Sequence, residues 1–184
     1  MGKRFARMED GHLAFILRQR IFFTASAAAE GRVNVSPKGL DTLRVLDANR
    51  VAYLDLTGSG NETAAHLAAT GRLTLMFCAF EGPPMILRLY GQGRVLRKGA
   101  AGYAELLPKF GPEPPGSRQI IVLDVDLVQT SCGYAVPLLE YRGDRPSLIR
   151  WAEAKGQDGI EAYWREWNTR SIDGLPTGMP EAAE

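Results

Sequence analysis

The chain has 184 residues, 45% of them hydrophobic, and a formal net charge of +1. This length and composition allow one substantial hydrophobic core, so we expect one domain spanning residues 1–184. A nearly neutral chain carries no electrostatic signature of nucleic-acid binding, so no nucleic-acid partner is expected. Two cysteines are too few for a disulfide scaffold, and His12 and His66 are the only histidines, so no metal site is expected.

The sequence has no pattern that targets it to a membrane. Residues 1–10 contain basic residues but no uninterrupted apolar run behind them, which argues against a signal peptide. No stretch approaches the roughly 20 apolar residues that a membrane-spanning helix needs. We therefore expect a soluble, cytoplasmic protein without membrane contact.

Short strands dominate the predicted elements. Apolar or alternating β-rich segments predict strands at residues 21–26, 32–36, 51–56, 73–80, 85–95 and 120–128, with one more short strand within 40–49. Helical spacing predicts helices at residues 8–20, 100–110, 146–156 and 158–168, besides a short one that ends at Gly71. Because no βαβ rhythm occurs, we expect a mainly β fold, a β-barrel with peripheral helices. Its core spans about residues 20–137, and C-terminal helices and a strap follow over residues 146–178.

The segment 32–36 alternates strictly between apolar and polar residues. Val33 and Val35 share one side of the predicted strand, and the polar residues share the other. Pro37 is expected to end regular pairing, which leaves Lys38 at the mouth of the strand.

Two later strands carry further positional information. In the strand 85–95, Gly91 and Gly93 predict a bulge or a close approach of another backbone. The strand after it is expected to direct every second residue from Ile121 to Leu127 inward.

The most informative stretch runs from Val51 to Phe77 and has the pattern of strand, glycine-rich turn, short helix and strand. Asn61 or Thr63 can cap the helix, and Gly71 suits its C-terminal end. A helix start presents free N–H groups and the positive end of the helix dipole, which makes it a candidate phosphate site. The simpler alternative is an ordinary capped surface helix.

Charged and reactive residues give mixed signals. Lys38 and Arg32 could add positive charge to a phosphate site, whereas Glu62 would repel a phosphate unless its carboxylate points away. We interpret Glu62 as a first-turn acid that complements the helix dipole. His66 is interpreted as a partly exposed structural residue and Cys132 as a packed structural cysteine. No catalytic acid, base or nucleophile can be assigned.

Several phrases occur in an order that resembles a known family. They are Arg32-Val-Asn-Val-Ser-Pro-Lys-Gly39, Gly60-Asn-Glu-Thr63, Phe80-Glu-Gly-Pro-Pro84 and Thr130-Ser-Cys-Gly-Tyr134. Over about residues 12–137 the chain resembles the pyridoxamine 5′-phosphate oxidase-like, FMN-binding split-barrel superfamily, and more narrowly its uncharacterised members.

The resemblance implies a homodimer with FMN in the groove between two barrels. Three residues of the second strand would then line the flavin, namely Asn34, Ser36 and Lys38. Three positions at the helix start would hold its phosphate, namely Asn61, Glu62 and Thr63. The partner chain would supply residues from its later strands or tail, with Trp164 and Arg170 as candidates.

The resemblance also implies limits on the activity. True pyridoxamine phosphate oxidases carry an Arg-Lys pair where this chain has Glu62-Thr63, so conversion of pyridoxamine phosphate is not expected. We expect an FMN-dependent oxidoreductase acting on a small organic substrate. The alternatives are a non-catalytic flavin- or haem-binding protein for storage or sensing, and a structural dimer with an empty cleft. FAD, a deazaflavin or haem could replace FMN.

Overall fold

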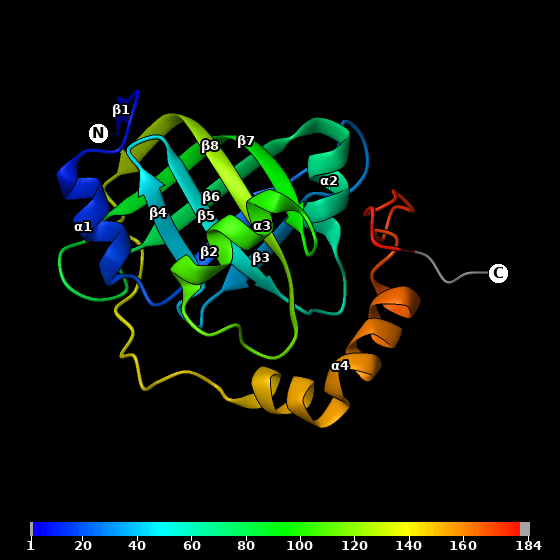
Figure 1. Cartoon of the computed structure of the whole chain (residues 1–184). Coiled ribbons are helices and arrows are strands. Elements are labelled where there is room, and N and C mark those ends of the chain that lie inside the picture. Colours follow the sequence, from blue (N-terminus) through cyan, green and yellow to red (C-terminus); the bar gives the residue numbers. More distant parts are fainter. Residues whose placement is uncertain (1, 181–184) are drawn as a thin grey trace.

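The computed structural model describes residues 2–180. These residues form eight strands of one antiparallel sheet: β1 (Lys3–Phe5), β2 (Phe22–Ser26), β3 (Asn34–Lys38), β4 (Leu43–Asp47), β5 (Arg50–Leu56), β6 (Arg72–Cys78), β7 (Ile86–Arg97) and β8 (Ser117–Ser131). The helices are α1 (Asp10–Arg18), α2 (Glu62–Thr70), α3 (Ala101–Leu106), the short 3-10 helix η1 (Leu107–Phe110) and α4 (Ser147–Trp167). The sheet curls in the order β3-β2-β6-β7-β8-β5-β4, with β1 beside β8 (Figure 1). The expected mainly β architecture with peripheral helices is confirmed.

Strands β5 and β8 pair with each other and are buried on both faces. On one face, Tyr53 and Ile121 belong to the main core. On the other face, Leu54 and Ile120 belong to a second cluster, which α3 helps to cover. Because apolar neighbours lie on both sides, residues 51–54 of β5 and residues 120–123 of β8 are continuous apolar runs.

Strand β3 lies at the edge of the sheet and pairs with β2. The expectation that Pro37 ends regular pairing is wrong, because Pro37 lies opposite Phe23 and Lys38 lies opposite Phe22. A proline is tolerated on an edge strand, where its missing N–H need not serve a neighbouring strand.

The two sides of β3 differ in the way that the sequence predicts. Val33, just before the strand, and Val35 share one side, but this apolar side is exposed, at 69% and 61%. Asn34, Ser36 and Lys38 are half-buried on the other side. An edge strand that exposes its apolar side and shelters its polar side is the reverse of the usual arrangement in a monomer.

The glycine in the middle of β7 marks a bulge, as predicted. The register of β7 against β8 shifts just before Gly91, and Asp126 is the extra residue in β8. A Cβ atom on Gly91 would lie 1.9 Å from the carbonyl oxygen of Asp124, so the backbones are in close contact. Beyond the bulge, Val128 is fully buried and Leu127 only partly. The expectation that Leu127 faces inward is therefore wrong, because the bulge changes the phase of the strand.

The helix ends agree with the sequence analysis in part. Helix α1 begins after Glu9, whose backbone N–H donates to Nδ1 of His12 at 3.0 Å. Helix α2 begins after Asn61 and ends at Gly71, which has a φ of 71°. Helix α4 joins both expected C-terminal helices, and Gly156 breaks its helical geometry with a φ of 64°.

The chain after β8 extends away from the sheet and then returns to it. Residues 132–146 form a coil that leads to α4, and the segment 168–178, here called the strap, reaches the start of α2 (Figure 1). Among the described residues, no helix has the length and apolar character needed to cross a membrane. Residues 181–184, where the end of the sequence predicts fraying, lie outside the described residues.

Candidate functional site

A cleft of about 900 Å³ opens between β3, the start of α2 and the strap. It brings together the six residues predicted to bind the cofactor within one chain: Asn34, Ser36, Lys38, Asn61, Glu62 and Thr63. Arg170, which was expected from the partner chain, lines the cleft of its own chain. Its charged residues are four basic ones (Arg32, Lys38, Arg118 and Arg170) and two acidic ones (Asp55 and Glu62), so their formal charge is +2. A cleft with an excess of one sign of charge attracts ligands of the opposite sign. The cleft is therefore a candidate site for an anionic ligand.

A row of hydrogen bonds holds the polar side of β3 in place. Nδ2 of Asn34 donates to Oγ1 of Thr63 at 3.2 Å and to Oγ of Ser26 at 3.4 Å. Oγ of Ser36 donates to Oδ1 of Asn34 at 3.1 Å. These bonds tie β3 to β2 and to the first turn of α2, so the donors on this wall have fixed positions.

Lys38 is fixed by a buried aspartate of β5. Its Nζ donates to Oδ1 of Asp55 at 2.9 Å, and only 5% of the Asp55 side chain is exposed. Oδ2 of Asp55 accepts from Nη2 of Arg118 at 2.8 Å and from Nε2 of Gln119 at 2.9 Å. Burial alone would raise the pKa of Asp55, but the charges of Arg118 and Lys38 outweigh it and hold that pKa well below its usual range. Asp55 therefore stays ionised and keeps the Lys38 ammonium group at the cleft.

Arg118 extends this network to the loop that precedes α2. Its side chain is 3% exposed, and its Nη1 donates to the carbonyl oxygen of Gly60 at 3.0 Å and to Oδ1 of Asn168 at 2.6 Å. Oδ1 of Asn61, also buried, accepts from Nε2 of Gln119 at 2.8 Å. The start of α2 is thus bonded to β8 and to the first residue of the strap.

Sequence reasoning missed Asp55, Arg118 and Gln119. Strand β8 begins at Ser117, three residues before the predicted start, because its polar first residues resemble a loop. One signal could have found the network. Asp55 is a charged residue inside an otherwise apolar strand, and a buried charge needs a partner.

The strap is bonded to both sides of the cleft entrance. Oε1 and Oε2 of Glu62, in the first turn of α2, accept from the backbone N–H of Ile172 at 3.0 and 3.1 Å. The backbone N–H of Arg32 donates to Oδ2 of Asp173 at 2.7 Å, and the two side chains form an ion pair. Arg170 also lines the cleft. The Glu62 carboxylate is thus engaged by the strap.

His66 is more deeply buried than its sequence suggests. The expectation of a partly exposed residue is wrong, because His66 is 1% exposed and belongs to the buried side of α2. Its Nδ1 lies 3.1 Å from Oγ of Ser26. Its Nε2 has no hydrogen-bond partner within the described residues, and His66 lines the cleft. Buried polar atoms are normally hydrogen-bonded, so the unpartnered Nε2 of His66 is an unusual feature of this wall.

The two tryptophans at the end of α4 have different positions. Trp164 is 8% exposed, packs with Ala152 and Ile160, and donates from its indole N–H to Oγ1 of Thr57 at 2.8 Å. It is buried in its own chain and lies outside the cleft. Trp167 is 55% exposed and lines the cleft, so it is the aromatic residue of α4 placed to cover a ligand.

The cysteines differ from each other as well. Cys78 is 7% exposed and belongs to the interior. Cys132 is exposed, so the interpretation as a packed cysteine is wrong. Within residues 2–180, no group of three or more histidine, cysteine or acidic side chains is arranged to hold a metal ion.

A curled antiparallel sheet with a cationic cleft at its edge defines a β-barrel protein with a candidate anion site. The family model of pyridoxamine 5′-phosphate oxidase matches residues 8–132. A pyridoxamine 5′-phosphate oxidase family protein of Aspergillus flavus, ustO, is 41% identical over 186 residues, which cover 92% of this chain and 75% of that protein. The chain therefore belongs to the pyridoxamine 5′-phosphate oxidase family, and the resemblance stated from its sequence is confirmed.

Solved structures agree with this assignment. A variant of HupZ from Group A Streptococcus superimposes with a TM-score of 0.53 at 18% identity, covering 67% of this chain and 99% of that chain. A candidate pyridoxamine 5′-phosphate oxidase from Lactobacillus delbrueckii also gives a TM-score of 0.53, at 16% identity, with 67% and 94% covered. At these identities the likeness concerns the fold, and it confirms the expected split barrel.

Proposed function

We propose that the protein is a homodimeric, FMN-binding flavoprotein that acts as an oxidoreductase on a small organic substrate. The observation that carries the proposal is the cationic cleft, where the polar side of β3 meets the start of α2 in a chain of this family. When bound, FMN would supply the hydride or electron transfer, and the protein would supply binding and orientation.

The start of α2 fits a phosphate group. The first N–H groups of a helix have no acceptor within the helix, and they lie at the positive end of its dipole. The side chain of Asn61 makes no capping bond here, because it is engaged by Gln119. The N–H groups at this helix start, together with the Thr63 hydroxyl group, would therefore bind the phosphate. Lys38 and Arg170 would add positive charge.

The polar side of β3 fits the edge of a flavin ring. Asn34 and Ser36 present an amide and a hydroxyl group that are fixed by hydrogen bonds, and Lys38 presents an ammonium group fixed by Asp55. These groups would hold the polar edge of the ring, with Lys38 placing a positive charge beside it. Trp167 would cover the ligand from the side of α4.

A second copy of the chain would cover the exposed side of β3. Val33 and Val35 line the rim of the cleft and are mostly exposed, although both are apolar. Burial of such a side against an identical chain would stabilise a dimer and would place the cleft at the interface. The homodimer is therefore part of the proposal.

The substrate would differ from pyridoxamine phosphate. Glu62 and Thr63 occupy the positions at which the family resemblance expects an Arg-Lys pair, and Glu62 is engaged by the strap. A site with one carboxylate in place of two cations is less suited to several phosphate groups at once.

A titration with FMN and riboflavin tests the flavoprotein proposal, because riboflavin has the same ring and lacks the phosphate. Quenching of flavin fluorescence is followed as protein is added. We expect FMN to bind at one per chain and riboflavin to bind at least about tenfold more weakly. Equal affinities would show that the cleft does not bind the phosphate group. If neither ligand binds, the flavoprotein proposal is overturned.

A non-catalytic binding protein is the alternative function, and His66 is the observation that favours it. An imidazole nitrogen is a common axial ligand of haem iron, and Nε2 of His66 has no partner among the described residues. However, His66 is 1% exposed, so α2 would have to move before His66 could reach an iron atom. A Soret band on addition of hemin would support haem binding. Oxidation of a reduced nicotinamide by the FMN-loaded protein would support the enzyme.

A further inference from the structure

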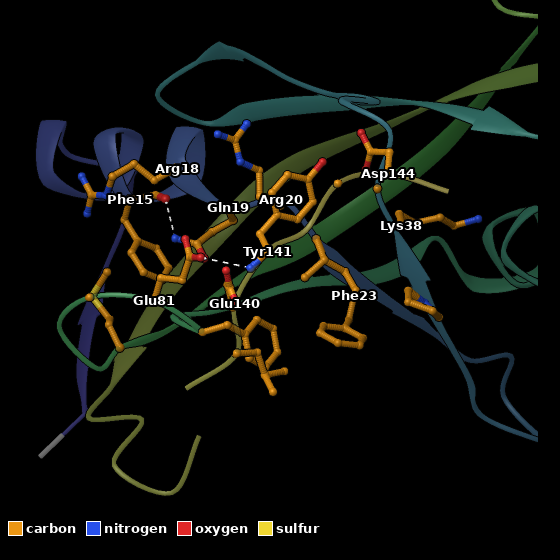
Figure 2. A pocket seen from close by; sticks show the side chains of 18 of the residues that line it. Phe15, Arg18, Gln19, Arg20, Phe23, Lys38, Glu81, Glu140, Tyr141 and Asp144 are labelled. Carbon is orange, nitrogen blue, oxygen red and sulfur yellow. Dashed lines mark hydrogen bonds between the residues drawn. The ribbon is translucent and has the colours of Figure 1, made fainter. Parts of the chain in front are cut away.

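A second and larger cavity, of about 1070 Å³, lies beside the cleft on the outer face of β2 and β3. Four aromatic side chains line it, together with Met85 and Leu139: Phe15, Phe23, Phe80 and Tyr141. Figure 2 shows Phe15, Arg20, Phe23 and Tyr141 gathered around this space. Pockets for small organic ligands usually measure roughly 300–1,000 Å³ and have mostly apolar walls with a few polar groups. The volume of this cavity lies just above that range, and charged side chains such as Arg18, Arg20 and Glu81 border its apolar lining.

One wall of the cavity is the coil segment 138–145, which has no helix or strand of its own. The segment is bonded to the loop after β6 at two points. The backbone N–H of Leu139 donates to the carbonyl oxygen of Phe80 at 2.9 Å, and that of Tyr141 donates to Oε1 of Glu81 at 3.2 Å. Arg20 stacks on the Tyr141 ring, with Cζ 5.3 Å from the ring centroid. The coil is therefore held beside the cavity at Leu139 and Tyr141.

The cavity and the cleft share a wall at the end of β3. Pro37 and Lys38 line both of them. Lys38 lines the cavity, yet its Nζ bonds to Asp55 in the cleft, and in Figure 2 this end of the side chain points away from the other labelled residues. A long side chain commonly packs its carbon stem on an apolar surface while its charged end reaches a polar one. A ligand in the cavity would thus lie next to the lysine that we assign to the flavin.

We propose that this cavity binds a small organic molecule with an aromatic body. Aromatic walls on several sides favour a flat aromatic ligand through stacked and edge-to-face contacts. Within the proposed function this molecule would be the substrate, and that identification rests on the proposed function. The binding site itself does not depend on a flavin.

Anilinonaphthalene sulfonate, an aromatic probe that fluoresces in apolar surroundings, tests the binding site on the full chain. Leu138 and Leu139 are adjacent, exposed leucines of the coil segment, and only Leu139 lines the cavity. A negative charge on the cavity wall opposes binding of an apolar, anionic probe, so Leu139→Asp should weaken probe binding by about tenfold or more. The matched Leu138→Asp should change it by less than about twofold.

A second pair of variants tests the opposite wall. Phe23 and Met76 face each other across β2 and β6, both are half-buried, and only Phe23 lines the cavity. Phe23→Ala should weaken probe binding, and Met76→Ala should leave it unchanged. Loss of binding in both cavity variants, with both controls unaffected, supports the proposal.

Two results would overturn it. If all four variants bind the probe as the unmodified chain does, the probe occupies another place and the cavity is not its site. If Leu139→Asp converts a dimer to a monomer in sedimentation, the cavity is an interface between copies. An FMN titration separates the two proposals. If the chain binds the probe at this cavity but does not bind FMN, the cavity proposal stands and the proposed function is overturned. If it binds FMN but not the probe, the proposed function stands and the cavity proposal is overturned.

Discussion

Both carboxylate oxygens of Glu62 accept the backbone N–H of Ile172, at 3.0 and 3.1 Å. This contact joins the first turn of α2 to the strap on the wall of the cleft. It has two opposing effects on an anionic ligand, because it holds the strap in place and also keeps a negative charge near the proposed phosphate site. A substitution that removes the charge and keeps the acceptor separates these effects.

Glu62→Gln should strengthen FMN binding about two- to fivefold. The amide oxygen can still accept from Ile172, and removal of the charge relieves its repulsion of the phosphate, for which a two- to fivefold change corresponds to roughly 0.4–1 kcal/mol. Fluorescence quenching gives the dissociation constant. Glu166→Gln, an exposed position on α4, is the control and should have no effect. Weaker binding by the Glu62 variant would show that its charge is not facing the ligand.

Lys38→Met should weaken FMN binding by about tenfold, because it removes a fixed positive charge and keeps most of the side-chain volume. The matched control is Lys109→Met, at an exposed lysine of η1. The same titration measures both variants, and the redox potential of bound flavin gives a second readout. If neither the affinity nor the potential changes, Lys38 does not belong to the flavin site.

Asp55→Asn should lower the free energy of unfolding by about 3 kcal/mol at neutral pH, because the buried guanidinium of Arg118 loses its counter-charge. Urea denaturation measures this loss. Asp126→Asn, at an exposed position of β8, is the control and should change stability by less than about 0.5 kcal/mol.

The difference in unfolding free energy between the unmodified chain and Asp55→Asn should also depend on pH, and the direction of that dependence follows from the pKa of Asp55. The pKa of Asp55 in the folded state lies well below that of an unfolded aspartate, which is about 3.9. The stability that ionised Asp55 contributes is fully present above the unfolded pKa and is lost as the pH falls below it, towards the folded pKa. The difference between the unmodified chain and Asp55→Asn should therefore be constant between about pH 5 and 7 and should shrink below about pH 4. A difference that grows in acid would contradict this assignment.

Gly91→Ala should destabilise the sheet by several kcal/mol, roughly 2–4, because its Cβ would meet the backbone of β8 at 1.9 Å and neither strand can move freely. Gly11→Ala is the matched control. Gly11 lies in α1, and a Cβ atom added there would have no neighbour within 4 Å, so alanine should be neutral or stabilise by up to about 1 kcal/mol. Thermal unfolding compares the two variants.

Val35→Glu should shift the proposed homodimer to monomer, because it places a charge on the apolar side of β3 that the second copy would cover. Leu17→Glu, at another exposed apolar residue, in α1, is the control. Sedimentation velocity measures both. A dimer that survives Val35→Glu unchanged would move the interface elsewhere.

Local patterns predicted seven of the eight described strands, all except β1, and one wall of the cleft. The alternation around Val35 correctly separated the two sides of β3, and the glycine-rich turn before α2 correctly marked the start of that helix. These features depend on residues that are close in sequence, so propensity and periodicity are sufficient to find them.

The rest depends on the topology of the sheet, which local patterns do not encode. Asp55 and Arg118 are 63 residues apart and meet because β5 pairs with β8. His66 is buried because α2 packs against β2, which places Ser26 beside its ring. The alternation in β3 predicted which residues share a side. Periodicity alone could not tell which of the two sides faces the interior.

The hydrogen bond between Arg118 and Asn168 joins the barrel to a residue that lies beyond the part of the chain matched by the family model. The family model ends at residue 132, at the end of the barrel strands, whereas the buried network beneath the cleft continues through Asn168 to Thr177. A shorter chain could retain every strand and still leave the Arg118 guanidinium without one of its acceptors. A match over the strands therefore establishes the barrel of a relative, but not the network that completes its cleft.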